Sequence, residues 1–259
     1  MDILRKELNQ VYASQNLGAE RLDRGELERC KALAENLVAV TDGAAVITDV
    51  SNDSSFLCTG ALCRLLGLAP CDGMVCELDS SDEDVIYERL HPEDLVEKRM
   101  LEYELFKLVD ALPPEEKRNY KATCTIRILD GEGRFRLIDN STQVLRLSPA
   151  GKMWLVLCRY DVSPRKSYDE GVGIDVRILN NHTGESRALE LTERRTRVLT
   201  DREKEVLTLI RDGLPSKQIA DELDISIHTV NRHRQNILEK LSVGNSVEAV
   251  FAATAMRLI

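Results

Sequence analysis

Apolar residues in the first 38 positions recur at near-helical spacing, in a stretch rich in Leu, Ala, Glu and Arg. Because residues three and four apart share one face of a helix, the pattern predicts an amphipathic helix, with a break near Gly25. This helix either makes dimer contacts or only covers the domain that follows. From Val38 to Thr48 the residues are mostly apolar and β-branched, and a polar turn separates them from Phe56–Cys58. This arrangement predicts a β-hairpin.

The next segment alternates between apolar and polar stretches. Ala61–Leu68 has apolar residues at helical spacing, and an irregular acidic loop follows from Asp72 to Asp84. Pro92 and the two carboxylates after it suit a helix start, because proline fits the first helical position and acidic groups are stabilised at the amino end of a helix. We expect a long helix from Pro92 to about Ala111, which Pro113 ends.

Three consecutive segments then show the pattern of β-strands: Tyr120–Leu129, Phe135–Leu147 and Met153–Val162. In the first, mostly apolar even positions alternate with polar odd positions. Successive hairpin strands form an antiparallel sheet and an α+β fold, whereas a phosphoacceptor receiver domain alternates strands and helices through a parallel sheet. We therefore expect no aspartate phosphorylation. Residues 169–191 predict a linker with one further hairpin, which turns at Asn180–Gly184.

Start and stop signals divide the C-terminal segment into short helices. Thr200–Glu203 has the capping-box pattern, and Gly213 suits a helix end because glycine adopts a positive φ freely. Ser216 is expected to cap a second, short helix, and Ser226 a third that runs to about Leu241. Two helices joined by a tight turn form a helix-turn-helix, whose second helix is the candidate for the major groove of DNA.

The third of these helices has an apolar side and a polar side. At 100° per residue, four residues form a stripe that we expect to face the core: Val230, His233, Ile237 and Leu241. His233 is thus predicted to pack inside and to hydrogen-bond a neighbouring segment. The opposite side presents the residues predicted to contact bases, since Asn and Gln pair with adenine and Arg with guanine: His228, Asn231, Arg232 and Gln235. Three flanking residues are predicted to contact phosphates: Lys217, Thr229 and Arg234.

The stretch from Leu199 to Ile259 closely resembles the LuxR/NarL-type DNA-binding domain. The family pattern LT-x-R-E-x-E-V-L matches LTDREKEVL, K-x-I-A-x-x-L matches KQIADEL, and T-V-x-x-H-x-x-N-I-x-x-K-L matches TVNRHRQNILEKL. The resemblance implies base contacts by Asn231, Arg232 and Gln235. It also implies a fourth helix, Ser246–Ile259, that exposes three residues for dimer contacts on DNA: Val250, Ala253 and Met256. Many relatives have lysine at position 231 and arginine at position 246, so this chain has less positive charge for phosphates.

Residues 33–164 resemble a PAS domain. The likeness is carried by LHPEDL from Leu90, by the long helix after it, by IRILDGEGRFRLIDN and by a strand ending in YDVSP. It implies an antiparallel sheet with a helical side that can form a pocket, and a sensor of a small molecule, a redox state or a protein. Four residues would either line that pocket or form ordinary core: Cys124, Ile126, Leu137 and Trp154. We divide the chain into a helical leader (1–32), a PAS-like sensor (33–165), a linker (166–196) and a helix-turn-helix domain (197–259).

A net charge of −9 disfavours binding to DNA phosphates, but the distribution of that charge along the chain changes this inference. Residues 197–259 carry nine Lys and Arg against nine Asp and Glu, so the whole excess lies in residues 1–196. The sequence therefore predicts an acidic sensor attached to a neutral DNA-binding domain of modest non-specific affinity. The N-terminus lacks a signal-peptide pattern and no long uncharged run is present, so we expect a cytoplasmic protein without a membrane span.

Cysteine spacing and catalytic motifs give little support for other classes of site. Four of the seven cysteines follow C-x4-C-x7-C-x4-C, which differs from the C-x2-C pairs of structural zinc sites, so we expect reduced thiols, no metal and no evident cofactor. Without a recognisable nucleophile and base, we predict no enzymatic activity. The sequence favours a dimeric transcriptional regulator that binds double-stranded DNA. The alternatives are an interaction adaptor with a degenerate helix-turn-helix, or a small-molecule enzyme in the N-terminal half.

Overall fold

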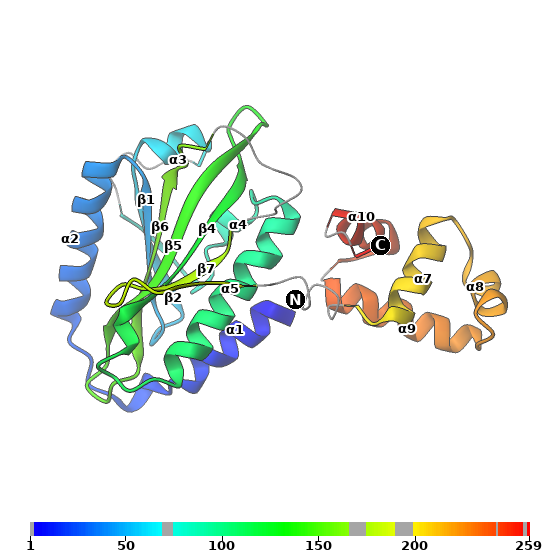
Figure 1. Ribbon diagram of the computed structural model, residues 1–259, viewed down its shortest axis with the longest axis horizontal. Coiled ribbons are helices and arrows are strands. Elements are labelled where there is room, and N and C mark those ends of the chain that lie inside the picture. Colours follow the sequence, from blue (N-terminus) through cyan, green and yellow to red (C-terminus); the bar gives the residue numbers. More distant parts are fainter. Residues whose placement is uncertain (1–2, 69–74, 166–174, 190–198, 242, 256–257) are drawn as a thin grey trace. The chain divides into compact units, whose positions relative to one another are not determined.

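The computed structural model describes residues 3–68, 75–165, 175–189, 199–241, 243–255 and 258–259 (Figure 1). The chain divides into one unit spanning Leu8–Leu189 and a second comprising Met1–Glu7 and Glu190–Ile259. We call residues 8–189 the sheet domain and residues 199–259 the helical domain. No helix among the described residues is long and apolar enough to cross a bilayer.

The sheet domain is built on eight antiparallel strands in the order β3-β2-β1-β6-β5-β4-β7-β8. Their bounds are β1 Ala44–Asp49, β2 Ser54–Thr59, β3 Val75–Leu78, β4 Tyr120–Leu129, β5 Phe135–Leu147, β6 Met153–Val162, β7 Arg177–Asn180 and β8 Ser186–Ala188. The three long strands β4, β5 and β6 coincide with the three predicted segments, and they form a continuous meander. The predicted α+β fold with an antiparallel sheet is confirmed.

Helices cover both faces of this sheet (Figure 1). They are α1 Ile3–Ser14, α2 Arg24–Thr41, α3 Ala61–Leu65, α4 Asp84–Tyr87 and α5 Pro92–Asp110, with 3-10 turns at Leu17–Ala19 and Lys117–Asn119. The face under α2 has an apolar core in which Cys30, Ala34 and Val38 pack against strand residues such as Ile47 and Leu157. Helices α4 and α5 lie on the opposite face, and the Tyr12 ring of α1 packs against the Phe106 ring of α5 at a tilt of 53°, with centroids 5.4 Å apart.

Several predicted boundaries in the sheet domain are wrong. The helical break spans residues 15–23 and ends before Gly25. Helix α2 begins at Arg24 because the Asp23 carboxylate accepts the Gly25 N–H at 2.8 Å and caps the helix. Helix α2 continues to Thr41 and ends at Asp42, which has a positive φ of 55°, so β1 starts six residues later than the predicted strand at Val38. The predicted acidic loop from Asp72 to Asp84 contains β3 and ends at the first residue of α4. The predicted linker hairpin is part of the sheet through the pairing of β7 with β4.

The helical domain contains α7 Asp201–Arg211, α8 Ser216–Glu222, α9 Ile227–Leu241 and α10 Ser246–Ala255. The capping box of Thr200 and Glu203 is present, and Gly213 has a φ of +86°, as predicted. Ser226 accepts the Thr229 N–H at 3.0 Å. The prediction for Ser216 is wrong, because Pro215 occupies the N-cap position and no side chain caps α8.

Candidate nucleic-acid interface

Helix α9 presents one apolar face to the core and one polar face to solvent. Val230, Ile237 and Leu241 are buried in the core of the helical domain, together with Leu199, Val206 and Ile219. The four residues predicted to contact bases are all exposed: His228, Asn231, Arg232 and Gln235. Within the described residues, none of these four side chains makes a hydrogen bond or an ion pair. The fold therefore holds their backbone rigidly and leaves their polar groups available.

Internal polar contacts fix α9 to the helices around it. Lys240 near the end of α9 donates to the buried Glu203 carboxylate at 2.6 Å. Burial alone would raise the pKa of Glu203, but the hydrogen bonds from Lys240 and from the Thr200 N–H lower it below its usual range. Arg202 of α7 donates to the Leu223 carbonyl at 2.6 Å, just before the turn into α9. Both contacts hold the polar face of α9 in one orientation.

The three residues predicted to contact phosphates differ in their surroundings. Lys217 is exposed, and Thr229 is half-buried with its hydroxyl 2.8 Å from the Ser226 hydroxyl. Arg234 is half-buried and donates to the hydroxyls of Ser216 and Ser246, each at 2.9 Å. Its guanidinium thus joins the start of α8 to the start of α10. The sequence predicts a phosphate contact for Arg234, whereas its guanidinium has partners inside the helical domain. The Ser246 hydroxyl is an acceptor in this arrangement.

His233 differs from its prediction in its hydrogen bonding. Its side chain is half-buried on the inner side of α9, which agrees with the packed position expected. However, its Nδ1 atom is buried and has no hydrogen-bond partner among the described residues. The expected bond to a neighbouring segment is therefore not made by Nδ1.

The residues expected to form a dimer contact on α10 do not share one exposed face. Ala253 is fully buried in the helical-domain core beside Ala249, because small side chains allow α10 to approach α7 and α9. The expectation that Ala253 is exposed is wrong. Val250 is half-buried, and Met256 lies outside the described residues. Val247 of α10 is 81% exposed.

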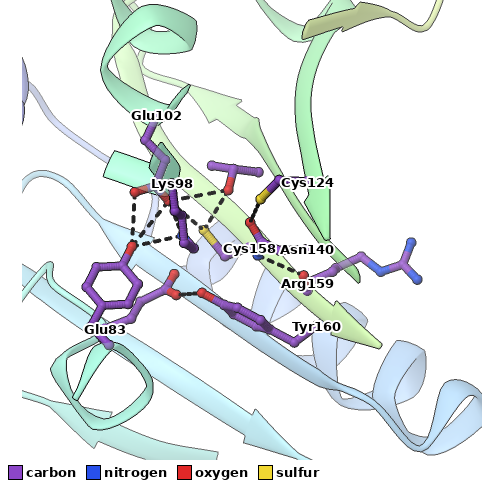
Figure 2. Close-up of polar contacts among 10 residues, drawn as sticks. Glu83, Lys98, Glu102, Cys124, Asn140, Cys158, Arg159 and Tyr160 are labelled. Atoms are coloured by element: carbon purple, nitrogen blue, oxygen red, sulfur yellow. Dashed lines mark hydrogen bonds and ion pairs between the residues drawn. The ribbon is translucent and has the colours of Figure 1, made fainter. Parts of the chain in front are cut away.

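A second polar cluster, which the sequence did not predict, lies inside the sheet domain (Figure 2). It gathers seven side chains, each no more than 6% exposed: Glu83, Tyr87, Lys98, Glu102, Thr142, Cys158 and Tyr160. Lys98 and Glu102 of α5 form an ion pair, and Tyr87 of α4 bonds both, at 2.9 Å to the ammonium and 3.0 Å to the carboxylate. We call these seven residues the buried cluster.

The second carboxyl group of the buried cluster, that of Glu83, is bonded by a tyrosine hydroxyl. Tyr160 of β6 donates to Glu83, which precedes α4, and the Thr142 hydroxyl lies 3.3 Å from the Cys158 sulfur. Burial raises the pKa of Glu83. Burial alone would lower the pKa of Lys98, but the carboxylates of Glu102 and Glu83 outweigh it and raise that pKa. Lys98 is therefore charged at neutral pH, and Glu83 takes up a proton more readily than an exposed glutamate does.

Two of the four residues considered for a sensor pocket, Trp154 and Cys124, lie on opposite faces of the sheet. Trp154 belongs to the apolar core under α2, where its indole N–H donates to Asp49 at 3.1 Å. Cys124 belongs to the other face, where its thiol donates to the side-chain Oδ1 atom of Asn140 at 3.7 Å, near the buried cluster (Figure 2). These side chains therefore serve two separate cores.

One group of described residues has the side chains for a metal ion: His91, Glu93 and Asp94, with ligand atoms within 4.8 Å of one another. The Arg127 guanidinium already bridges the two carboxylates, at 2.8 Å from Glu93 and 2.5 Å from Asp94. A metal ion would have to displace that cation, so these residues fit an internal ion pair better than a metal centre.

Comparison with known proteins identifies the helical domain. Residues 197–253 match the family model described as bacterial regulatory proteins, luxR family. The chain is 56% identical over 52 residues to the transcriptional regulatory protein DesR of Bacillus subtilis, covering 20% of this chain and 26% of that protein. It is 47% identical over 58 residues to the nitrate/nitrite response regulator protein NarL of Escherichia coli, covering 22% of this chain and 27% of NarL. The helical domain is therefore a LuxR-family helix-turn-helix domain, and the match spans about a quarter of each relative.

A longer but much weaker similarity extends to a solved structure. The Vibrio cholerae VqmA dimer without its target DNA aligns over 86% of this chain and 92% of that one, at 14% identity and a TM-score of 0.28. This similarity is too low to support an inference about the sheet domain.

Proposed function

We propose that this protein is a transcriptional regulator whose helical domain binds double-stranded DNA through the exposed face of α9. The observation that carries the proposal is the set of four exposed polar side chains on that face that have no partner among the residues the structure describes: His228, Asn231, Arg232 and Gln235. In a helix-turn-helix the second helix enters the major groove, where such side chains meet base edges. The names of the relatives matched by this domain support a regulatory role.

We further propose that the sheet domain is a PAS-like sensor that controls the helical domain. Its antiparallel sheet and the helices α3, α4 and α5 between β2 and β4 supply the two layers that the PAS resemblance implies. The sensor would respond to a small molecule, a redox state or a protein. The proposed role of the chain is binding and control of transcription, without a chemical reaction of its own.

Binding as a homodimer is part of the proposal, with α10 as the contact. Since Ala253 is buried and Val250 is half-buried against the core, the contact is assigned to the outward side of the helix at Val247, which is 81% exposed. An exposed valine on a short helix gains stability when a second copy covers it.

Titration of the full chain with fluorescently labelled duplex DNA at several KCl concentrations tests the proposal. The logarithm of the affinity should fall linearly with the logarithm of salt concentration, because binding releases counterions from the phosphates. Arg232→Ala should weaken binding. Arg177→Ala should not, because Arg177 lies on β7 and its ion pair with Asp175 is outside the helical domain. The absence of binding at low salt would reject the proposal and favour the adaptor with a degenerate helix-turn-helix.

A further inference from the structure

Ile227, the first residue of α9, is an apolar side chain that the fold leaves in water. It is 49% exposed and belongs neither to the core of the helical domain nor to the apolar residues packed against it. Its neighbours Ser226 and His228 are also exposed. A single exposed isoleucine is common on protein surfaces, so its position on α9 decides its interpretation.

That position is at the edge of the proposed base-contacting face. Ile227 precedes Asn231 by four residues, so the two side chains lie on the same side of α9. Helical side chains tilt toward the amino end of their helix, so the Ile227 side chain projects beyond the start of α9. Residues at the amino end of a recognition helix are the ones that meet base edges in the major groove.

We infer that Ile227 packs against the C5-methyl group of a thymine in the major groove. Thymine differs from the other bases there by this apolar group, and a methyl contact needs no hydrogen-bond partner. Burying the methyl and the isoleucine against each other removes both from water, which is favourable. The inference rests on the proposed function, and it adds an apolar element of sequence preference to the polar contacts of Asn231, Arg232 and Gln235.

Replacing thymine by uracil tests the contact, because uracil lacks only the methyl group. Duplexes that bind the full chain are selected from a random pool and resynthesised with deoxyuridine at one thymine position at a time. Wild-type protein should bind about fourfold more weakly when one particular thymine of a half-site is replaced, the change expected for exposing one methyl-sized group. Other positions should change little.

The Ile227→Ala variant assigns that loss to its residue. It should bind the thymine and uracil duplexes equally, and its fold should persist because alanine favours helix and the core residues of α9 are unchanged. Val40→Ala, at an 85% exposed position on α2, is the control and should keep the fourfold preference for thymine. The inference is overturned if wild-type protein tolerates uracil at every position, or if Ile227→Ala keeps the preference. A pool from which no duplex is selected would instead reject the proposed function, and the thymine contact with it.

Discussion

The exposed face of α9 and the buried cluster under α5 use polar side chains in opposite ways. On α9, the polar groups of Asn231, Arg232 and Gln235 lack partners within the described protein, while the apolar side of the same helix is fixed in the core. In the buried cluster, Lys98 and Glu102 are held by each other and by Tyr87. A polar side chain is therefore available for a partner only where the fold has not already satisfied it.

Breaking the buried cluster should produce the largest effect. Lys98→Met removes the ammonium and leaves Glu102 buried without its counter-ion, which should lower the free energy of unfolding by about 3–5 kcal/mol. Trp154 is the single tryptophan and lies in the sheet domain, so urea unfolding followed by its fluorescence reports this domain. Arg177→Met removes one partner of an exposed ion pair and should cost less than about 1 kcal/mol.

The double variant Lys98→Met/Glu102→Met separates charge from packing. Since it leaves neither charge of the pair in the interior, it should regain much of the stability that Lys98→Met loses. Equal losses in Lys98→Met and Arg177→Met would show that the buried pair is no more important than an exposed one.

Arg234 tests the boundary between the two uses of polar groups, because it lies on α9 but has internal partners. Arg234→Ala should destabilise the helical domain by about 1.5–3 kcal/mol, as expected for hydrogen bonds to a charged group. Hydrogen exchange measured by mass spectrometry should become faster in α8 and α10, whose first residues Arg234 joins. Arg211→Ala, at an exposed ion pair with Asp212, is the matched control. If hydrogen exchange in α8 and α10 were unchanged in Arg234→Ala, and the salt dependence of its DNA binding were smaller by about one phosphate contact, Arg234 would be a DNA contact instead.

The pH dependence of stability should depend on Glu83. Because burial raises its pKa in the folded state, the folded protein binds a proton that the unfolded chain releases at pH values between the ordinary and the raised pKa. The free energy of unfolding should therefore fall as pH rises through that interval. The glutamine of Glu83→Gln cannot ionise. The free energy of unfolding of the variant, measured by urea unfolding, should therefore rise relative to that of the wild type as pH increases. A difference that is independent of pH would contradict this.

Features that depend on neighbouring residues could be predicted from the sequence, and those that depend on distant ones could not. The alternation within β4 and the capping box at Thr200 are local patterns, and both are present. Lys98 and Glu102 are four residues apart on a helix, a spacing typical of exposed pairs, and nothing nearby shows that a sheet covers them. The partners of Arg234 lie 18 and 12 residues away, so a helical wheel alone assigns it to solvent.

The same distinction applies to the candidate site. The stripe of Val230, Ile237 and Leu241 correctly predicted the inward side of α9, and thereby the exposed side. Ala253 was misplaced because alanine is common both inside and outside proteins, and its burial depends on how closely α10 approaches other helices.

The central claim, that the exposed face of α9 contacts base edges, is tested most directly by measuring the affinity of Arg232→Ala for a set of duplexes that differ at single base pairs. Arg232 is exposed and unpaired among the described residues, so its removal should change the free energy of unfolding by no more than about 0.5 kcal/mol. The account predicts a loss of about 1–3 kcal/mol of discrimination at one base pair, with discrimination at other positions kept. An equal loss of affinity for every duplex would contradict it, because Arg232 would then contact only the phosphate backbone.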